Sequence, residues 1–289
     1  MADFTAPAKI NLHLQVLGKR PDGFHELFTS FAYVDIADEL RVEPCDELRV
    51  RCNIPHLNGE ENLVWQVLNA LRERFAIDKG LSVDIDKRLP EQAGLGGGSS
   101  DAATALMTAN RMWGLGMSRD ELIEFATPFG ADIPCFLFGR ASMACGVGER
   151  LRSLETPLPD ASVLLVYPGV GLSTARVFSR IDTGELTLSD TADTMRARVD
   201  PDMLGHNDLE TAAGQLCPEM AGMLDKLREM ADKAWMSGSG TACVGLFKDR
   251  HKLRDADRLI RKDWPQAWVH AGKLQNEHPF DREWRLHGA

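Results

Sequence analysis

The sequence predicts an α+β fold divided into two domains. Strand-like and helix-like patterns follow one another in mixed order along the chain, which is expected when helices pack against a sheet. The 289 residues are enough for two medium domains. Pro157 and Pro159 interrupt these patterns near the middle, which gives expected domains over 1–157 and 158–289. We expect a cleft at the interface between them.

The first expected element is a half-buried strand over 8–16, where apolar and polar residues alternate. Lys9 and Asn11 belong to its polar set. They should point the same way, about 6–7 Å apart, because a strand rises roughly 3.3 Å per residue. The next segment, 18–26, carries glycine and proline and should be a loop.

The later patterns predict the remaining elements by apolar spacing and capping signals. Before the boundary we expect strands near 27–36 and 39–52, a helix over 61–75, a strand over 81–86, a helix that begins at Ser99 or Ser100 and ends before Gly114, and a helix opened by a capping box at Ser118 and Glu121. After it we expect a strand over 162–169, helices near 174–180, 207–216, 219–232 and 249–262, and a strand near 267–272. The polar tail 275–289 is expected to be a surface extension.

Charge and composition argue against several classes of protein. The formal net charge of −10 argues against a nucleic-acid partner, because phosphate backbones are held mainly by clustered lysine and arginine. The sequence predicts neither a signal peptide nor an apolar stretch long enough to span a membrane. The six cysteines lack metal-ligand spacing, so we expect them to be reduced and mostly buried. These observations predict a cytoplasmic protein that binds neither nucleic acid nor a membrane, and they leave its oligomeric state open.

A glycine-rich stretch, GLGGGSS over 94–100, lies between the strand over 81–86 and the next helix. A helix N-terminus carries partial positive charge and amides without intrahelical partners, so it binds phosphate, and glycine lets the ligand approach. Ser99 and Ser100 add hydroxyl groups that could hold magnesium, and Asp101 suits a first helical turn or a metal ion. A tight turn without a ligand is the alternative. The stretch fits neither the Walker pattern nor the dinucleotide fingerprint.

Three segments together resemble the motifs of one enzyme family. They are PAKINLHLQVLGKRPDGFHEL, LPEQAGLGGGSSDAA and MSGSGTACVGLF, in that order along the chain. In order and spacing they are similar to the motifs of the GHMP kinases, and GADIP and NDLE add to the resemblance. The resemblance implies an N-terminal domain like the second domain of ribosomal protein S5 and a C-terminal ferredoxin-like domain. It also implies ATP and Mg²⁺ in the cleft, with transfer of the γ-phosphoryl group to a hydroxyl of a cytidylyl substrate.

The resemblance assigns the reacting groups. Lys9 matches the family lysine that polarises the acceptor hydroxyl, and Asp132, in GADIP, matches the catalytic aspartate. Phosphoryl transfer passes through a loose transition state, so positioning and charge stabilisation matter more than a strong base. Asn11 is expected to orient the acceptor end of the substrate. Taken singly, Lys9 could be a solvated strand lysine and Asp132 a turn residue.

The resemblance also assigns binding residues. Phe24, His25 and Phe178 match positions that recognise cytosine, although Phe178 alone could be a core residue. Asn62 matches a position near adenine, and Lys87 could approach the nucleotide or be solvated. The expected phosphate loop consists of Gly94, Leu95, Gly96, Gly97, Gly98, Ser99 and Ser100, and the third motif contributes Gly238, Ser239 and Gly240.

Two departures and three alternatives accompany this interpretation. Gln92 stands where the family usually has a small residue, and Phe24 replaces a commoner tyrosine. Asn207 and Asp208 match a family dipeptide that we interpret as mainly structural. The alternatives are a homoserine, mevalonate or galactose kinase of the same family, a catalytically silent metabolite-binding protein on the same fold, and a nicotinamide-linked oxidoreductase. The presence of both Lys9 and Asp132 argues against the silent protein.

Overall fold

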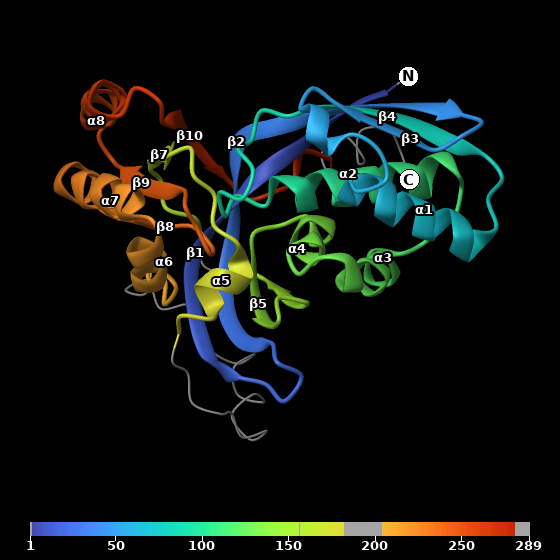
Figure 1. Ribbon diagram of the computed structural model, residues 1–289, viewed down its shortest axis with the longest axis horizontal. Helices are drawn as coiled ribbons and strands as arrows, with labels where there is room; N and C mark the ends of the chain where they lie inside the picture. Colours follow the sequence, from blue (N-terminus) through green and yellow to red (C-terminus); the bar gives the residue numbers. More distant parts are fainter. Residues whose placement is uncertain (1, 156, 182–203, 281–289) are drawn as a thin grey trace.

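The computed structural model describes residues 2–155, 157–181 and 204–280, which form two lobes (Figure 1). In this part of the chain ten strands belong to one hydrogen-bonded sheet with the path β3-β4-β2-β10-β7-β9-β8, while β1 and β5 pair with β2, and β6 pairs with β5. The strands are β1 (Ala2–Lys19), β2 (His25–Cys45), β3 (Arg49–Cys52), β4 (Gly80–Asp86), β5 (Ser142–Gly146), β6 (Arg150–Ser153), β7 (Ser162–Tyr167), β8 (Lys233–Met236), β9 (Cys243–Phe247) and β10 (Trp268–Gln275). The α+β prediction is confirmed.

The helices lie close to the predicted segments, except for α4, which was not predicted. They are α1 (Leu63–Phe75), α2 (Gly97–Met112), α3 (Arg119–Ala126), α4 (Ile133–Phe138), α5 (Thr174–Phe178), α6 (Glu210–Leu216), α7 (Pro218–Met230) and α8 (Arg250–Asp263), with short 3₁₀ turns η1 (Pro55–Leu57) and η2 (Thr127–Phe129). The predicted capping box at Ser118 and Glu121 opens α3. No helix in the described residues is long and apolar enough to cross a membrane.

In the N-terminal lobe, α1 to α4 pack beside the β1–β4 part of the sheet (Figure 1). Helix α2 is buried at every position from Ser100 to Asn110. Its apolar side chains join those of α1 and β2 in one core. Because packing fixes α2 along its length, its N-terminus has a fixed position relative to β1.

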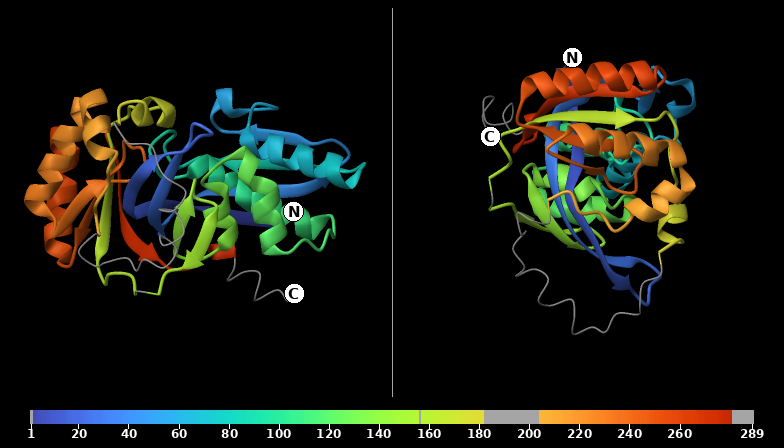
Figure 2. Two further views of the ribbon diagram at one scale, coloured as in Figure 1. Left: turned by 90° about the horizontal axis from the view of Figure 1, so that it is seen from below. Right: turned by 90° about the vertical axis from the view of Figure 1, so that its left-hand side faces the viewer.

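In the C-terminal lobe, four antiparallel strands lie in the order β10-β7-β9-β8. In chain order this is fourth, first, third, second, the arrangement of a ferredoxin-like domain, as expected. Helices α6, α7 and α8 cover the outer face of this sheet (Figures 1 and 2). The opposite face packs against β1 and β2, where Ile10 and Ala32 meet Val163 and Val244.

The junction of the lobes explains one difference from the prediction, which concerns the tail. The last residues of β10 pair with β2 (Leu274 with Val34), and His278 and Phe280 are buried. The prediction that the whole tail from 275 is a surface extension is therefore wrong for His278 and Phe280, because their side chains are buried against the N-terminal core. The boundary at Pro157 stays a prediction.

Other differences from the prediction concern where the strands begin and end. The segments predicted as separate strands near 27–36 and 39–52 form one long strand, β2, and the short strand β3, since a register shift carries the pairing past the interruption. Strands β1 and β2 also extend into the predicted loop over 18–26.

The prediction of reduced, mostly buried cysteines agrees with the structure: all six are free, and all except Cys45 and Cys52 are buried.

Candidate active site

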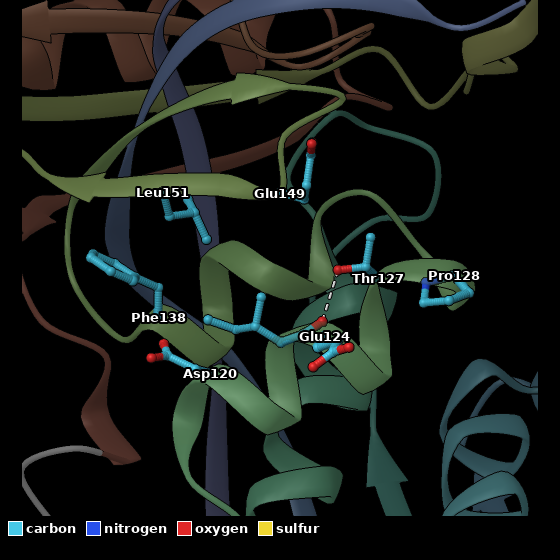
Figure 3. Close-up of a pocket in the computed structure, with 8 residues that line it drawn as sticks. Asp120, Glu124, Thr127, Pro128, Phe138, Glu149 and Leu151 are labelled. Carbon is cyan, nitrogen blue, oxygen red and sulfur yellow. Dashed lines mark hydrogen bonds between the residues drawn. The ribbon is translucent and has the colours of Figure 1, made fainter. Parts of the chain in front are cut away.

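A cleft of about 1360 Å³ lies where the lobes meet. Its lining includes residues from all three segments singled out in the sequence, and every predicted site residue lines it except Leu95 and Ser100. Both of these are buried behind the loop surface. A second hollow of about 440 Å³, shown in Figure 3, lies near α3 and β6 and contains none of the predicted site residues. It is lined by Asp120, Ile123, Glu124, Thr127, Pro128, Phe138, Glu149 and Leu151.

The predicted phosphate loop joins β4 to α2. Helix α2 begins at Gly97, two residues before the expected start, because the Ser100 amide already donates to the Gly96 carbonyl (2.9 Å). Gly96 is the N-cap in a left-handed conformation and has no side chain to bond the first amides. These amides are left for a ligand. A Cβ atom at Gly96 would lie 2.9 Å from the Phe136 ring.

Backbone hydrogen bonds fasten this loop to both lobes. The Lys9 amide of β1 donates to the Leu95 carbonyl (2.9 Å), and the Ala242 amide donates to the Ala93 carbonyl (2.9 Å). The Ser237 hydroxyl, in the third motif, donates to the Gly94 carbonyl (2.9 Å). The loop is thus held against β1 on one side and the C-terminal lobe on the other.

Lys9 and Asp132 come together beside the helix N-terminus. The Lys9 ammonium is 3.4 Å from the Asp132 carboxylate and donates to the Asn11 side-chain carbonyl (2.8 Å). The Asn11 side-chain NH₂ group donates in turn to the Thr29 hydroxyl (2.8 Å). Asp132 directly precedes α4, but its carboxylate does not cap that helix. The Lys9 side chain is 3% exposed and that of Asp132 is 37% exposed, so a ligand can reach the pair from the Asp132 side.

Lys87 is not solvated, which corrects one of its two sequence interpretations. Its ammonium forms ion pairs with the buried carboxylates of Asp38 and Asp101, the latter at 2.8 Å. Burial alone would lower the pKa of Lys87, but the carboxylates of Asp101 and Asp38 raise it above its usual value. The pairing engages one carboxylate oxygen of Asp101, and a metal-ligand role for this residue stays a prediction. A Cβ atom at Gly97 would lie 3.0 Å from the Lys87 nitrogen, so this cluster supports the first turn of α2.

The buried cluster makes the stability of the fold depend on pH. Burial raises the pKa of Asp101 to about 8 despite the opposing Lys87 ammonium, and Asp38 adds to the rise. In the unfolded chain an aspartate titrates near pH 4, so between about pH 4 and 8 the folded cluster of Asp38, Lys87 and Asp101 holds one extra proton, which its members share. We expect this group's contribution to the unfolding free energy to fall as the pH rises through that range, by at most about 1.4 kcal/mol per pH unit.

Urea unfolding of Asp101→Asn should show this. Because asparagine is neutral at every pH, the variant is expected to lose the downward slope between about pH 5.5 and 8. The exposed Asp120 on α3 provides the control, and Asp120→Asn should keep the slope. An Asp101→Asn slope equal to that of the unsubstituted chain would contradict the assignment.

The aromatic residues predicted to recognise cytosine lie at another part of the cleft. The rings of His25 and Phe178 stack with centroids 4.9 Å apart, and the Phe24 side chain is 63% exposed. Burial lowers the pKa of His25, and the positive charge of Lys19 lowers it further, so the ring favours its neutral form. A neutral imidazole offers one donor and one acceptor.

Asn62 has a local structural task. Its side chain caps α1 by accepting from the Val64 amide (2.9 Å) and donates to the Leu57 carbonyl (2.7 Å). The residue also lines the cleft. Contact with adenine stays a prediction.

The comparisons with known proteins include two family models, whose matches contain the second and third motifs. The models "GHMP kinases N terminal domain" and "GHMP kinases C terminal" match residues 62–140 and 197–266. A 4-diphosphocytidyl-2-C-methyl-D-erythritol kinase from Alcanivorax borkumensis is 38% identical over 276 residues, covering 91% of this chain and 87% of the relative. The chain belongs to the 4-diphosphocytidyl-2-C-methyl-D-erythritol kinase family.

Solved structures agree with this family assignment. A crystal structure of 4-(cytidine 5'-diphospho)-2C-methyl-D-erythritol kinase matches with a TM-score of 0.75 and 34% identity, covering 95% of this chain and 100% of the other. A mevalonate kinase matches with a TM-score of 0.70 but only 13% identity, covering 96% and 100%, so it shares the fold. This chain has the same arrangement of both lobes as that mevalonate kinase.

The third motif of this kinase family member forms a turn that lines the cleft. Gly238 and Gly240 have φ angles of +57° and +87°, and the Ser239 hydroxyl lies 2.9 Å from that of Thr174. Sequence reasoning missed Ser237, which links the Asn11 amide to the Gly94 carbonyl. It also missed Asp38. Ser237 stands inside the quoted motif MSGSG, and that position is the signal that could have indicated it.

Proposed function

We propose that this chain transfers the γ-phosphoryl group of ATP to the 2-hydroxyl of 4-diphosphocytidyl-2-C-methyl-D-erythritol. The observation that supports this most strongly is the 3.4 Å pairing of Lys9 with Asp132 beside the N-terminus of α2. An ammonium, a carboxylate and free helix amides in one cleft suit transfer of a charged group to an alcohol. The activity named for relatives of 36–40% identity agrees with it.

Lys9 and Asp132 have different roles in the proposed transfer because their charges are opposite. In this proposal the acceptor hydroxyl contacts both Lys9 and Asp132 from the exposed side of the pair, where the Lys9 ammonium stabilises negative charge as the oxygen attacks. A carboxylate is a weak base for an alcohol, so the Asp132 oxygen takes the proton late, as the new bond forms. Asn11 holds the Lys9 nitrogen in place through its 2.8 Å hydrogen bond. The amides at the start of α2 bind the phosphate oxygens.

Magnesium fits the same corner of the cleft. The described residues contain no group of three His, Cys, Asp or Glu that could hold a metal ion by themselves. Mg²⁺ commonly uses one or two protein oxygens together with phosphates and water. The Ser99 hydroxyl, 3.8 Å from an ideal Cβ position on Gly130, and the Asp132 carboxylate both line the cleft. Bound there, the ion would neutralise charge on the phosphates.

The aromatic end of the cleft suits a pyrimidine base. Phe24, His25 and Phe178 offer ring faces, and base–aromatic stacking contributes about 1–3 kcal/mol per base. The imidazole of His25 can add one hydrogen bond to the base edge. A cytosine ring at this end places the rest of the substrate toward Asn11.

ADP release measured in a coupled assay tests the proposed function. The cytidylyl substrate should give a kcat/KM exceeding those of homoserine and mevalonate by about 10⁴-fold, since polar groups built for one substrate reject others. Equal or faster turnover of homoserine or mevalonate would overturn the substrate assignment. Binding of ATP with no turnover of any acceptor would favour the catalytically silent protein, and absorbance change of NADH would favour the oxidoreductase.

Gly98→Ala tests whether the phosphates lie on the first turn of α2. A Cβ atom there meets nothing within 4 Å, and the φ angle is not left-handed. Alanine is therefore expected to raise the unfolding free energy by about 0.5–1 kcal/mol. It should nevertheless weaken binding of a non-hydrolysable ATP analogue about tenfold or more, a loss of roughly 1.4 kcal/mol, because the methyl group occupies space that a phosphate needs.

Titration calorimetry and urea unfolding measure the two effects separately. Gly222, inside α7, also has nothing within 4 Å of an ideal Cβ atom. Gly222→Ala should give the same rise in stability and leave nucleotide affinity unchanged. An unaltered affinity in Gly98→Ala would show that phosphate lies elsewhere.

A further inference from the structure

A short segment around Asn207 connects β1 to the third motif. The Leu14 amide donates to the His206 carbonyl (2.9 Å), and the Asp208 amide donates to the Leu14 carbonyl (3.0 Å). The Asp208 carboxylate accepts from the Val16 amide (2.7 Å). The segment therefore follows β1 like an additional strand, and its position is fixed relative to Lys9 on the same strand.

The side chain of Asn207 extends from this segment to the third motif. It is 8% exposed, and its amide group donates to the carbonyls of Met236 (2.7 Å) and Gly238 (2.8 Å). Its carbonyl oxygen accepts from the Leu209 amide (2.9 Å). Asparagine supplies two donors and an acceptor at this length, whereas aspartate would set a carboxylate against two carbonyl oxygens.

The two carbonyls that Asn207 holds flank Ser237. The Ser237 hydroxyl donates to Gly94 in the phosphate loop and accepts from the Asn11 amide (3.2 Å). The connection thus runs from β1 through the hydrogen bonds of Asn207 to the backbone on either side of Ser237, and from the Ser237 hydroxyl to the phosphate loop. Lys9 of the reacting pair lies on β1, and the proposed phosphate site lies on that loop.

We infer that Asn207 is a positioning residue for the phosphoryl transfer. It fixes the turn that contains Ser237 and so keeps the phosphate loop aligned with Lys9 and Asn11. This inference rests on the proposed function. Misplacement of reacting groups by about 1 Å can lower a rate about 10²-fold, even when the change lies away from the chemistry.

Asn110 provides a matched control for the test. It is 7% exposed and uses its side chain in the same way, donating to the Met117 carbonyl (2.8 Å) and accepting from its amide (3.0 Å), at the far end of α2. Asn207→Ala and Asn110→Ala should both lower the unfolding free energy. Only Asn207→Ala should lower kcat, by about 10- to 100-fold, with the KM for ATP changed less than about threefold.

Ser237→Ala covers the case in which Asn207→Ala does not fold. It breaks the next link while leaving the Asn207 hydrogen bonds in place, so it should lower kcat in the same way. The inference is overturned if either folded variant keeps a kcat within about twofold of the unsubstituted chain. Failure of the proposed function is a separate result, because the unsubstituted chain would then show no turnover of the cytidylyl substrate.

Discussion

Asp132→Ala is expected to lower the turnover number by about 10²–10⁴-fold, the range for loss of a group that transfers a proton. The carboxylate lies 3.4 Å from the Lys9 ammonium and is the exposed member of the pair. Removing it leaves the acceptor hydroxyl without a proton acceptor, while the amides at the start of α2 are untouched. The affinity for ATP should therefore change little. Steady-state ADP release and calorimetry with an ATP analogue measure the two quantities.

Two further variants sharpen this experiment. Asp132→Asn keeps the shape of the side chain but removes its basicity, so it should lose nearly as much turnover as the alanine variant. Asp120→Ala removes a carboxylate that lines the separate hollow of Figure 3 and should leave turnover unchanged. An Asp132→Ala enzyme with normal turnover would rule out the assigned role.

Much of the fold could be predicted because local signals carried it. The apolar spacing of Val64, Val67, Leu68 and Leu71 predicts α1, and all four are buried there. The capping box of α3 is present with both of its hydrogen bonds. Such features depend on residues a few positions apart, so the sequence contains them directly.

The remaining differences arise from contacts between distant residues. His278 and Phe280 belong to a tail of polar composition, yet they are buried against the N-terminal core. No periodic pattern indicates that β10 continues from β7 onto β2. The early start of α2 has a similar cause, because packing along the helix outweighs the poor helix propensity of Gly97 and Gly98.

Some residues of the candidate site likewise follow from the local pattern, while others depend on distant partners. The alternation in β1 predicts that Lys9 and Asn11 share a face, and their side chains are hydrogen-bonded. The same reasoning could not decide the fate of Lys87, because its partners Asp38 and Asp101 lie 49 and 14 residues away. Whether a lysine meets a ligand or a carboxylate depends on tertiary neighbours that spacing does not encode.

Gly94→Ala is expected to abolish most activity because Gly94 lies at the contact between the phosphate loop and the third motif. Gly94 has a φ angle of +77°, and an added Cβ atom would lie 2.1 Å from the Ser237 carbonyl oxygen and 3.1 Å from the Gly240 nitrogen. These are backbone atoms, so the loop and the third motif must separate. We expect kcat/KM to fall by about 10²-fold or more, because both the phosphates and the reacting pair lose alignment.

Gly114→Ala separates this clash from backbone strain. Gly114 has a similar φ angle of +65°, but nothing lies within 4 Å of its ideal Cβ position. Alanine there should cost about 1–2 kcal/mol of stability and leave kcat/KM unchanged, since only the left-handed conformation is penalised. If Gly94→Ala also kept normal kcat/KM while losing the same stability, contact between the two loops would have no part in catalysis. A loss of activity confined to Gly94→Ala would show that this contact between the two loops aligns the phosphates.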